Sequence, residues 1–582
     1  MKFIIVSGGV LSGLGKGITA ASIGLLLKSS GIKTTCVKCD MYLNIDAGTM
    51  NPVEHGEVFV THDGLETDQD LGHYERFLNQ TLRSANYLTN GQIYKEVLDK
   101  ERALKYDGKC VEPYHHLPPE IEERWYLAGK VNKAKVVIVE LGGTVGEYEG
   151  LMFFETARRI KLKRPDNLVF VHVGYLPMPP SIGELKSKPL QQSVSLLNSL
   201  GIQPDFIVAR SEKPVDGKRR EKIALASGLK KENIIANPDM ECVYEVPLVL
   251  NKQKLAEKII KKLRITAKKR NLKKWEAMVA KAKSSKTPVK IAIVGKYQKT
   301  GDYMLKDSYV CVVEALRHAA LAFKRKIEMV WVDSEKLENL KEKEIAEVFS
   351  EARGILVPQG WGSRGTEGKI RAARFARENK IPYLGLCFGM QMAVAEFARN
   401  VLGLAQANSL EANAKTPYPV IHIIPEQKKY LLEHQYGGTI RLGAWPCEIK
   451  EGSLMEASYK KFGKGKTAPW HLPNPNQPKT DLGKGLLIYE RHRHRYEFNL
   501  EYKEKFEEKG MVFSGMSPDG KLVEAVEISG HPFFVGTQFH PEYLSRPLSP
   551  HPIFLSFIGA AVSKKSSYYR FSPTISPSTI RL

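Results

Sequence analysis

The stretch Pro382–Gln391 reads PYLGLCFGMQ: an apolar strand, a G-x-C-x-G turn and the start of a helix. Small residues on both sides of a nucleophile permit the sharp turn that lifts its side chain to the helix N-terminus. That location lowers the pKa of a thiol, and the N–H group after it can stabilise an oxyanion. The stretch therefore predicts a strand–turn–helix unit of an α/β domain, with Cys387 as its nucleophile.

A cysteine nucleophile needs a base, and a candidate lies near the C-terminus. After the apolar run 533–539 comes His540-Pro541-Glu542. His540 can accept the thiol proton and return it to a leaving ammonia molecule, while Glu542 fixes the imidazole tautomer. A buried structural cysteine is the ordinary alternative, but it leaves this combination of turn and H-x-E motif unexplained.

The rest of the chain alternates short β-rich apolar runs with helical patterns, which favours doubly wound parallel sheets. Early runs of this kind are 3–6, 136–139 and 206–209, and a fresh strand starts at Val289 after a basic, polar stretch. We expect an α/β protein with two doubly wound domains. The expected parts are 1–272, a linker at 273–288, a second domain at 289–562 and a mobile tail at 563–582.

A glycine-rich turn follows the first predicted strand. It reads SGGVLSGLGKG (7–17), and a helical run comes next. Glycines let backbone N–H groups close around phosphate oxygens, and the helix N-terminus adds partial positive charge. Lys16 would add a point charge. The Walker A spacing is not met, because five residues separate Gly9 from Gly15 and Gly17 stands where Ser or Thr is expected. A bare strand–helix turn is the alternative.

Carboxylates lie where such a loop would need a cation. Glu140 ends the predicted strand 136–139, and Asp70 follows a segment rich in turn residues. In open α/β sheets ligands bind beyond the carboxyl ends of the strands. Mg²⁺ prefers one or two carboxylates plus phosphate oxygens, although carboxylates in turns are often only helix caps.

The net charge of +23 has two interpretations. It could mark a nucleic-acid surface, or a lining for polyanionic small molecules together with solvated lysine-rich helices. Much of the excess lies in 252–290, and a run of this kind is usually a solvated face or linker. No zinc-finger, RRM or KH signature is present. We expect no nucleic-acid partner.

The composition, 42% hydrophobic and 26% charged, is that of an ordinary globular protein. The longest apolar runs fall far short of the roughly 20 residues that span a bilayer, and the run at 1–6 is too short for a signal peptide. Seven cysteines form no disulfide framework, and Cys36-x-x-Cys39 lacks a second ligand pair for zinc. We expect a cytoplasmic protein with no membrane partner.

These motifs resemble a known family. Residues 289–562 resemble class I glutamine amidotransferase domains, and 1–562 as a whole resembles the CTP synthase family. The matching segments are SGGVLSGLGKG (7–17), DAGTMNPVEHGEVFVTHDGLETDQDLGHYERF (46–77), VELGGTVGE (139–147), GELKSKPLQQS (183–193), ARFARENKIPYLGLCFGMQ (373–391), ERHRHRYE (490–497) and QFHPEY (538–543).

The resemblance implies a P-loop-like amidoligase, or synthetase, domain followed by a class I glutamine amidotransferase domain. It implies that ATP phosphorylates O4 of UTP, ammonia from L-glutamine attacks C4, and phosphate leaves to give CTP in de novo pyrimidine biosynthesis. Mg²⁺ would be the cofactor, ATP a co-substrate, GTP an allosteric activator and CTP a feedback inhibitor. Members commonly form homotetramers and can form filaments.

The resemblance also implies roles for individual residues. The glutaminase triad would be Cys387, His540 and Glu542, with glutamine held by Gly360, Phe388, Gln391, Glu411 and Arg495. ATP and the transferring phosphate would contact Ser12, Gly13, Leu14, Gly15, Lys16, Gly17, Lys38, Asp70 and Arg210, with Mg²⁺ on Asp70 and Glu140. UTP and CTP would contact Ser12, Glu147, Tyr148, Glu149, Lys186, Lys188, Gln191 and Lys222, and an ammonia passage would be lined by Pro52, His55 and Val58.

Two segments depart from the family pattern. Residues 358–362 read P-Q-G-W-G, whereas the family usually has P-G-G-F-G. Gly360 is retained as the expected oxyanion donor, but Gln359 replaces a glycine, so its backbone must adopt angles that a side chain permits. We expect an effect on the rate or fit of the glutaminase step. At 101–108 a usual second arginine is replaced by Ala103, which bears on the strength of GTP activation.

Two other interpretations stay open. An ATP-dependent amidoligase acting on another acceptor, such as a tetrapyrrole acid, would share both motifs but should lack the segments 147–149 and 183–193. A nucleic-acid-binding or structural polymer would use the basic surface and leave Cys387 and His540 unexplained.

Overall fold

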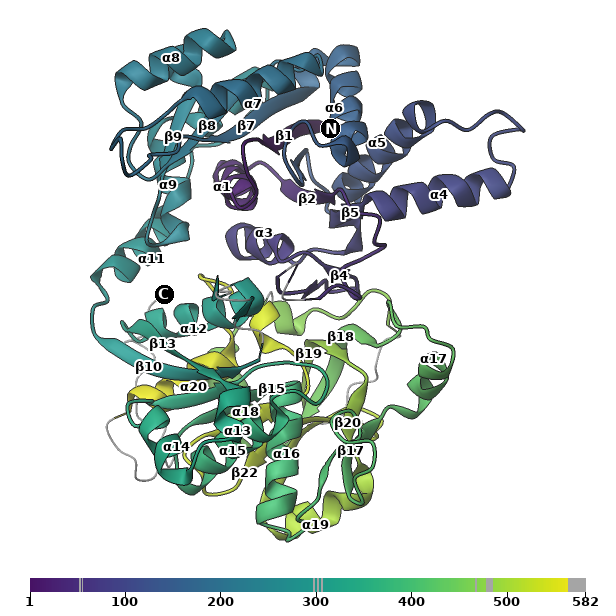
Figure 1. The fold of residues 1–582 in the computed structure, drawn as a ribbon, viewed down its shortest axis with the longest axis vertical. Coiled ribbons are helices and arrows are strands. Elements are labelled where there is room, and N and C mark those ends of the chain that lie inside the picture. Colours follow the sequence, from purple (N-terminus) through teal and green to yellow (C-terminus); the bar gives the residue numbers. More distant parts are fainter. Residues whose placement is uncertain are drawn as a thin grey trace. The chain divides into compact units, whose positions relative to one another are not determined.

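The computed structural model describes residues 1–51, 54, 56–296, 299–300, 303–304, 307–465, 468–477 and 485–563 of the chain. Two compact units emerge. Unit 1 is Met1–Ala47 with Asp70–Val279, and unit 2 is Gly48–Gln69 with Ala280–Leu582. Each contains a β-sheet flanked by helices (Figure 1), so the predicted α/β class with two sheet domains is confirmed.

Unit 1 is built on a seven-stranded sheet in the order β5-β2-β6-β1-β7-β8-β9, and all neighbouring strands are parallel. The strands are β1 (Lys2–Gly8), β2 (Thr34–Asp40), β5 (Tyr87–Thr89), β6 (Val136–Leu141), β7 (Leu168–Tyr175), β8 (Phe206–Ser211) and β9 (Ile234–Pro238). The strands β2, β5 and β6 lie on one side of β1, and β7, β8 and β9 lie on the other. Because all of them are parallel, the loops after β1, β2 and β6 lie at the same end of the sheet, the carboxyl-terminal end, where open α/β sheets bind ligands.

Helices cover both faces of this sheet. They are α1 (Lys16–Ser29), α3 (Asp70–Leu78), α4 (Asn90–Arg102), α5 (Pro113–Val131), α6 (Leu151–Lys163), α7 (Lys188–Ser199), α8 (Gly217–Ser227), α9 (Val246–Lys252) and α10 (Leu255–Lys262). Trp125 of α5 and Phe153 of α6 pack in one cluster with Val137 of β6. On the opposite face a Cβ on Gly24 of α1 would lie 3.3 Å from Ile138. Alternation along β6 thus sends neighbouring residues to different helices.

Unit 2 contains a nine-stranded sheet in the order β13-β10-β14-β15-β23-β22-β21-β18-β19. Its strands are β10 (Pro288–Gly295), β13 (Lys326–Asp333), β14 (Gly354–Val357), β15 (Tyr383–Leu386), β18 (Arg441–Ile449), β19 (Leu486–His494), β21 (Met511–Met516), β22 (Val523–Ile528) and β23 (Phe534–Thr537). The strands from β13 to β23 are parallel, and the rest pair antiparallel. The antiparallel half was not predicted, because the stretch 463–485 between β18 and β19 reads as an insertion.

The remaining elements of unit 2 are short strands and helices. The strands are β3 (Phe59–Val60), β4 (Glu66–Thr67), β11 (Lys299–Thr300), β12 (Tyr303–Met304), β16 (Asn408–Ser409), β17 (Pro419–Ile423) and β20 (Tyr496–Phe498). The helices are α12 (Val310–Ala322), α13 (Ser334–Glu338), α14 (Glu342–Phe349), α15 (Thr366–Glu378), α16 (Phe388–Asn400), α17 (Lys428–Leu432), α18 (Leu454–Phe462), α19 (Lys503–Glu508) and α20 (Pro552–Val562). Nowhere in the described part of the chain is a helix long and apolar enough to cross a membrane.

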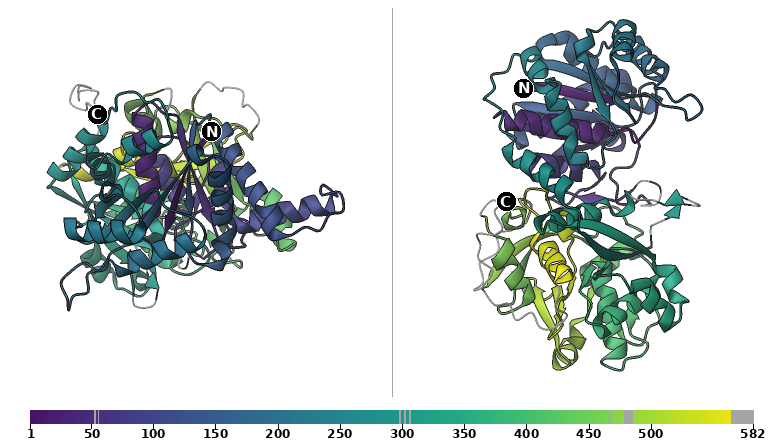
Figure 2. Two further views of the ribbon diagram at one scale, coloured as in Figure 1. Left: turned by 90° about the horizontal axis from the view of Figure 1, so that it is seen from above. Right: turned by 90° about the vertical axis from the view of Figure 1, so that its left-hand side faces the viewer.

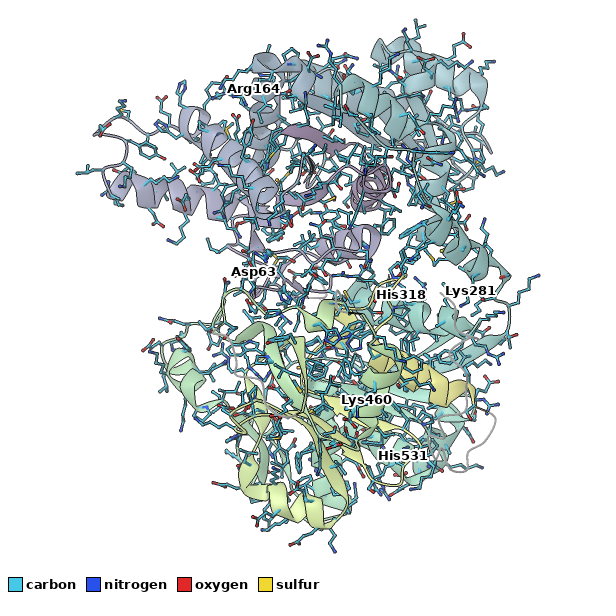
Figure 3. The ribbon with its side chains drawn as sticks, turned by 180° about the vertical axis from the view of Figure 1, so that it is seen from behind. Asp63, Arg164, Lys281, His318, Lys460 and His531 are labelled. Carbon is cyan, nitrogen blue, oxygen red and sulfur yellow. The ribbon has the colours of Figure 1, made fainter. Side chains whose placement is uncertain are left out.

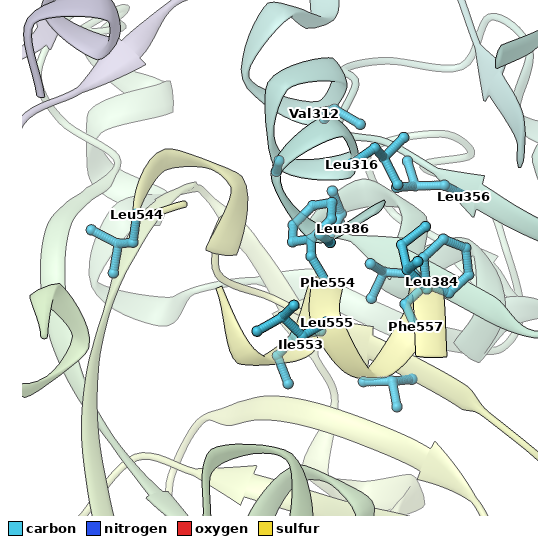
Figure 4. Packing of buried hydrophobic residues seen from close by; sticks show 14 of the residues in the cluster. Val312, Leu316, Leu356, Leu384, Leu386, Leu544, Ile553, Phe554, Leu555 and Phe557 are labelled. Carbon is cyan, nitrogen blue, oxygen red and sulfur yellow. The ribbon is translucent and has the colours of Figure 1, made fainter. Parts of the chain in front are cut away.

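The main core of unit 2 joins the parallel strands to α12 and α20 (Figure 4). Leu356 and Leu386 from the sheet cluster with Leu316 of α12 and with Phe554 and Phe557 of α20, and all five side chains are fully buried. This packing fixes the strand β15 that carries the predicted nucleophile at its end.

The segment Gly48–Gln69 packs with unit 2 although it lies far from that unit in sequence. Strands β3 and β4 form a hairpin whose turn contains Asp63 (Figure 3). The backbones of Gly64 and Gly443 approach closely, because a Cβ on Gly443 would lie 2.7 Å from the nitrogen of Gly64. Gly443 also has a φ of +80°, so a side chain there is disfavoured twice.

The compact units differ from the domain bounds expected from the sequence, which remain a prediction. Residues 48–69 fall in unit 2, and the expected linker contains the helix α11 (Lys273–Ser284). Trp275 of α11 is buried and donates its Nε1–H to the carbonyl oxygen of Tyr244 at 2.8 Å. The many lysines of this stretch suggested a linker, but its few apolar residues recur at helical spacing.

The helix α4 extends outward from the rest of unit 1, as the left view of Figure 2 shows. It presents apolar side chains to solvent: Leu98 is 59% exposed, and Leu104 just beyond the helix is 72% exposed. Exposed apolar side chains that gather on one projecting element are typical of an interaction surface.

We predict that Phe557→Ala destabilises unit 2 by about 3–5 kcal/mol, because the substitution empties a fully buried site in a packed core. Urea denaturation of the purified chain measures the change. Leu432→Ala is the control, since Leu432 is 78% exposed and should shift stability by less than about 0.5 kcal/mol. Equal effects of the two substitutions would contradict the packing described.

Candidate active sites

The loop between β1 and α1 has a backbone suited to anions. Val10, Gly13 and Gly15 have φ values between 71° and 88°, in the region that glycine adopts most readily. The helix α1 starts directly after Gly15, so N–H groups of its first turn are available to phosphate oxygens. Ser12 and Gly13 are exposed, whereas Leu14 is buried.

A buried ammonium group lies between carboxylates beside this loop. Lys38 of β2 forms an ion pair with Asp70 of α3, and its Nζ is 3.3 Å from Oε1 of Glu140 at the end of β6. Lys16 donates its Nζ–H to the carbonyl oxygen of Gly143 at 2.6 Å. The structure thus brings together both lysines and both carboxylates that the sequence suggested for ATP and Mg²⁺.

Burial and charge give the two carboxylates different proton affinities. Burial alone would raise the pKa of Asp70, but Lys38 and then His73 lower it to about 2. Burial, followed by the charge of Asp70, raises the pKa of Glu140 to about 7. Burial lowers the pKa of the Lys16 ammonium. Asp70 is therefore charged at neutral pH, whereas Glu140 gains or loses its proton near neutral pH.

These carboxylates fit a magnesium ion that arrives with a nucleotide. A Cβ on Gly17 would lie 2.1 Å from Oδ1 of Asp70, so only glycine lets this carboxylate approach the phosphate loop. Among the described residues, no group of three or more His, Cys, Asp or Glu side chains is placed to hold a metal. Two carboxylates with phosphate oxygens and water match the preference of Mg²⁺.

Most residues suggested for nucleotide binding lie in the segments that follow the parallel strands of unit 1. Arg210 of β8 donates its Nε–H to the carbonyl oxygen of Leu14 at 3.1 Å, and it pairs with Asp239 at 2.6 Å. Tyr148 precedes α6 and is 87% exposed. Of the others, Glu147 and Glu149 flank Tyr148, Lys186 precedes α7, Lys188 and Gln191 lie in its first turn, and Lys222 lies in α8, which packs against α7.

In unit 2, Cys387 occupies a strained turn between β15 and α16. Its φ of 51° and ψ of −105° are angles that residues with a side chain rarely adopt. A Cβ on Gly385 would lie 2.7 Å from the backbone of Gly389, and a Cβ on Gly389 would lie 2.0 Å from the carbonyl oxygen of Val357. Both glycines of the G-x-C-x-G pattern are therefore required by close approach, and the thiol sits at the helix N-terminus.

His540 follows β23 and is held by Glu542, whose Oε1 is 2.8 Å from Nδ1 of the imidazole. Burial would lower the pKa of His540, but Glu542 and then Cys387 raise it to about 10. The buried Nε2 makes no hydrogen bond within the described residues. Cys387 lies close enough to raise the pKa of the imidazole, and its thiol is the candidate partner of Nε2, since catalytic hydrogen bonds often tighten only when substrate binds.

Two groups near the thiol were missed by the sequence analysis. Gln538 donates its Nε2–H to Sγ of Cys387 at 3.5 Å, and the carbonyl oxygen of Arg493 lies 3.8 Å from the same sulfur. Both residues belong to segments that carry the family resemblance, QFHPEY and ERHRHRYE. Their place in those motifs was the available signal.

A buried lysine fixes the segment after β14 (Gly354–Val357) that carries Gly360. Lys369 of α15 donates its Nζ–H to the carbonyl oxygens of Pro358 at 2.7 Å and Gln359 at 3.3 Å. Burial, followed by the charge of Lys296, lowers the pKa of Lys369 well below its usual range. Because C=O and N–H of a trans peptide point in opposite directions, holding the Gln359 carbonyl sends the N–H of Gly360 the other way.

A second lysine holds the following turn. Lys296 donates to the carbonyl oxygens of Trp361 and, at 3.1 Å, Gly362. Its Nζ lies 4.6 Å from the ring centroid of Phe388, and burial lowers its pKa to about 8. A Cβ on Gly360 would lie 2.7 Å from Cε of Lys296. Neither lysine is predicted from the sequence as a site residue, since lysine usually lies on the surface.

The residues suggested for glutamine leave hydrogen-bonding atoms unused. Glu411 accepts the N–H of Gly362 at 2.8 Å, and burial raises its pKa. Arg495 donates Nη2–H to Thr439 at 2.8 Å. Its Nη1 and the Oε1 of Gln391 are buried and make no hydrogen bond within the described ranges. An acceptor and a donor are thus available for a ligand.

The segment 48–69 contributes a carboxylate that the sequence analysis did not name. Glu57 accepts Nε2–H of Gln359 at 2.9 Å and the backbone N–H of Cys311 at 2.6 Å. Gln359, which departs from the family pattern, thereby joins the loop after β14, which carries Gly360, to this segment. Nothing in the sequence spacing indicates a contact between residues so far apart.

Of the three residues suggested for an ammonia passage, the structure describes one. The carbonyl oxygen of Val58 accepts the hydroxyl of Tyr543 at 2.9 Å, and the Tyr543 ring stacks on His540. Tyr543 therefore contacts both Val58 and the catalytic candidate His540. Pro52 and His55 lie outside the described residues.

Comparison with known proteins identifies the family to which the chain is similar. Residues 2–265 match the family model described as the CTP synthase N-terminus, and 304–560 match that of class I glutamine amidotransferases. A CTP synthase of Halalkalibacterium halodurans is 49% identical over 97% of this chain and 99% of its own length. One from Sulfolobus acidocaldarius is 49% identical over 96% and 99%. The glutaminase domain of Trypanosoma brucei CTPS with bound acivicin is 35% identical, covers 48% of this chain and 95% of its own, and has a TM-score of 0.40.

We predict that Glu140→Gln stabilises the metal-free, nucleotide-free chain and that this gain in unfolding free energy grows as pH rises from 5 to 7.5. The raised folded pKa means that folded Glu140 keeps its proton after the unfolded chain has lost it, so wild-type stability falls between about pH 4.5 and 7. The gain at pH 7.5 relative to pH 4.5 is roughly 3 kcal/mol. Urea denaturation in EDTA measures it, with Glu123→Gln on the exposed side of α5 as control. A gain that does not depend on pH would contradict this assignment.

Proposed function

The chain belongs to the CTP synthase family of glutamine-dependent ligases, and we propose how its two candidate sites divide the reaction. It uses ATP, glutamine and nucleotide substrates. We infer that unit 2 releases ammonia from L-glutamine, and that unit 1 uses ATP to activate UTP for amination to CTP. The observation that carries the assignment is the strained, buried Cys387 at a helix N-terminus beside the His540–Glu542 pair.

The first half-reaction is glutamine hydrolysis. Cys387 gives its thiol proton to His540 and Sγ attacks the side-chain carbonyl carbon, and the N–H groups of Phe388 and Gly360 donate to the resulting oxyanion. His540 gives its proton to the amide nitrogen, the C–N bond breaks, and ammonia leaves a thioester on Cys387. Water, deprotonated by His540, then releases glutamate, while Glu542 holds the imidazole in place.

Recognition of glutamine rests on charge. Arg495 suits the α-carboxylate, because guanidinium binds carboxylates with two parallel hydrogen bonds and Nη1 is unused within the described chain. Glu411 suits the α-ammonium group by charge. The unused Oε1 of Gln391 is an acceptor for a ligand N–H.

The second half-reaction is amination. The γ-phosphoryl group of ATP is transferred to O4 of UTP, ammonia attacks C4, and phosphate leaves with O4 to give CTP. Lys16 and Lys38 neutralise the phosphates, and positioning and charge neutralisation are the main demands of phosphoryl transfer. Asp70 and Glu140 would hold Mg²⁺, which shields phosphate charge when bound.

The other nucleotide contacts follow from the family. ATP would lie along Ser12, Gly13, Leu14, Gly15, Gly17 and Arg210, and UTP, or CTP as feedback inhibitor, along Ser12, Glu147, Tyr148, Glu149, Lys186, Lys188, Gln191 and Lys222. GTP would activate the glutaminase step. The support from the structure is Arg210, which donates a hydrogen bond to the carbonyl oxygen of Leu14 in the phosphate loop.

Ammonia, assembly and location complete the proposal. Ammonia would pass along Pro52, His55 and Val58, since in bulk water it would be lost or protonated. The exposed Leu98 and Leu104 on and beside α4 support a subunit interface, and we propose a homotetramer that can form filaments. The protein would act in the cytoplasm.

We predict that Cys387→Ala abolishes CTP formation from glutamine but leaves formation from ammonium within about twofold, because ammonium bypasses the thiol. The assay contains UTP, ATP and Mg²⁺, with glutamine plus GTP or with ammonium alone. Cys110→Ala is the control, since Cys110 is exposed on another unit. Loss of both activities in Cys387→Ala would make Cys387 structural, and no CTP from either nitrogen source in wild type would require another acceptor.

A further inference from the structure

A small cavity in unit 2 adjoins the Cys387 site. Its volume is about 20 Å³, and its lining includes Glu57, Val58, Ser308, Gln359, Arg493 and Tyr543. On the order of 10–15 Å³ is enough for one water-sized molecule. The cavity therefore has room for a single molecule of that size.

The cavity wall touches the catalytic candidates. The carbonyl oxygen of Arg493 lies 3.8 Å from Sγ of Cys387. The ring of Tyr543 is stacked on that of His540, with 4.9 Å between centroids. Two residues of the cavity wall, Arg493 and Tyr543, therefore also contact the thiol and the imidazole.

Glu57 fixes the orientation of the Gln359 amide. A carboxylate only accepts hydrogen bonds, so the amide nitrogen of Gln359 must face it, at 2.9 Å. The other Glu57 oxygen accepts the N–H of Cys311 in the first turn of α12, where the helix N-terminus favours negative charge. The carbonyl oxygen Oε1 is the polar atom of Gln359 that remains.

Two polar atoms of the cavity residues are buried and make no hydrogen bond within the described part of the chain. They are Oε1 of Gln359 and Oγ of Ser308. An amide oxygen only accepts, whereas a hydroxyl both donates and accepts. Buried polar groups are normally hydrogen-bonded. A ligand that donates one hydrogen bond to Oε1 and accepts one from the hydroxyl would fit both atoms.

We propose that Gln359 and Ser308 form a binding site for one ammonia molecule released at Cys387, and that Gln359 positions it. The proposal rests on the glutaminase function proposed above. Ammonia donates one hydrogen bond to Oε1 of Gln359, and its lone pair accepts a hydrogen bond from the Ser308 hydroxyl. It forms next to this cavity, and Val58 of the proposed passage lies in the same wall. The glycine usual at position 359 would supply neither the Glu57 contact nor the acceptor.

The test measures the ratio of glutamate released to CTP formed by the full chain with glutamine as donor. Gln359→Leu keeps the bulk of the side chain without the amide, and Ser308→Ala removes only the hydroxyl. We expect either variant to raise the ratio by about three- to tenfold, the effect of losing one hydrogen bond, because unbound ammonia escapes to solvent. Ser556→Ala is the matched control. Its hydroxyl is also buried and unused within the described residues, but it does not line the cavity.

A purely structural role lowers glutamate and CTP formation together and leaves their ratio unchanged. An unchanged ratio in folded variants would therefore overturn the proposal and leave the cavity as a water site. If Gln359→Leu fails to fold, Ser308→Ala decides. The unsubstituted protein assayed with ammonium keeps the two proposals apart. No CTP there refutes the proposed function, whereas CTP with an unchanged ratio in the variants refutes the ammonia site alone.

Discussion

The left-handed backbone at Cys387 is the constraint around which unit 2 is arranged. It ends β15 and starts α16 within one residue, so the thiol is placed at the helix N-terminus without a flexible loop. The turn requires glycine at position 389, because a Cβ there would collide with the carbonyl oxygen of Val357 at the end of the neighbouring strand. Strain of this kind persists when the surroundings over-determine it, and here the parallel strands and the core beneath them do so.

Unit 1 depends on a different constraint, the burial of charge. Lys38 is surrounded by Asp70 and Glu140 at the strand ends, and buried ion pairs rarely stabilise a fold more than apolar residues of the same size would. The buried charges of Lys38, Asp70 and Glu140 are therefore better explained by binding of a charged ligand than by a contribution to the stability of the fold. The unused buried atoms of Gln391 and Arg495 in unit 2 have the same meaning, since proteins depart from local packing rules mainly at functional sites.

Local sequence was sufficient for much of this account. The G-x-C-x-G pattern predicted the turn at Cys387, and the apolar run 136–139 placed Glu140 at the carboxyl end of a strand in a parallel sheet. Contacts between distant segments could not be predicted. Glu57 and Gln359 are brought together only by the docking of 48–69 onto unit 2, and no periodicity encodes that. Lys369 looks like a surface residue of α15, because its burial depends on the carbonyl oxygens that receive it.

The proposed ammonia passage requires that nitrogen released at Cys387 goes into CTP without first mixing with solvent. The direct measurement supplies glutamine labelled with ¹⁵N at its amide, together with unlabelled ammonium, ATP, UTP, Mg²⁺ and GTP, and reads the isotope in the exocyclic amino group of CTP by mass spectrometry. The account predicts that CTP carries far more ¹⁵N than the ammonium in solution does at the same moment. CTP with the isotope content of the dissolved ammonium would contradict it.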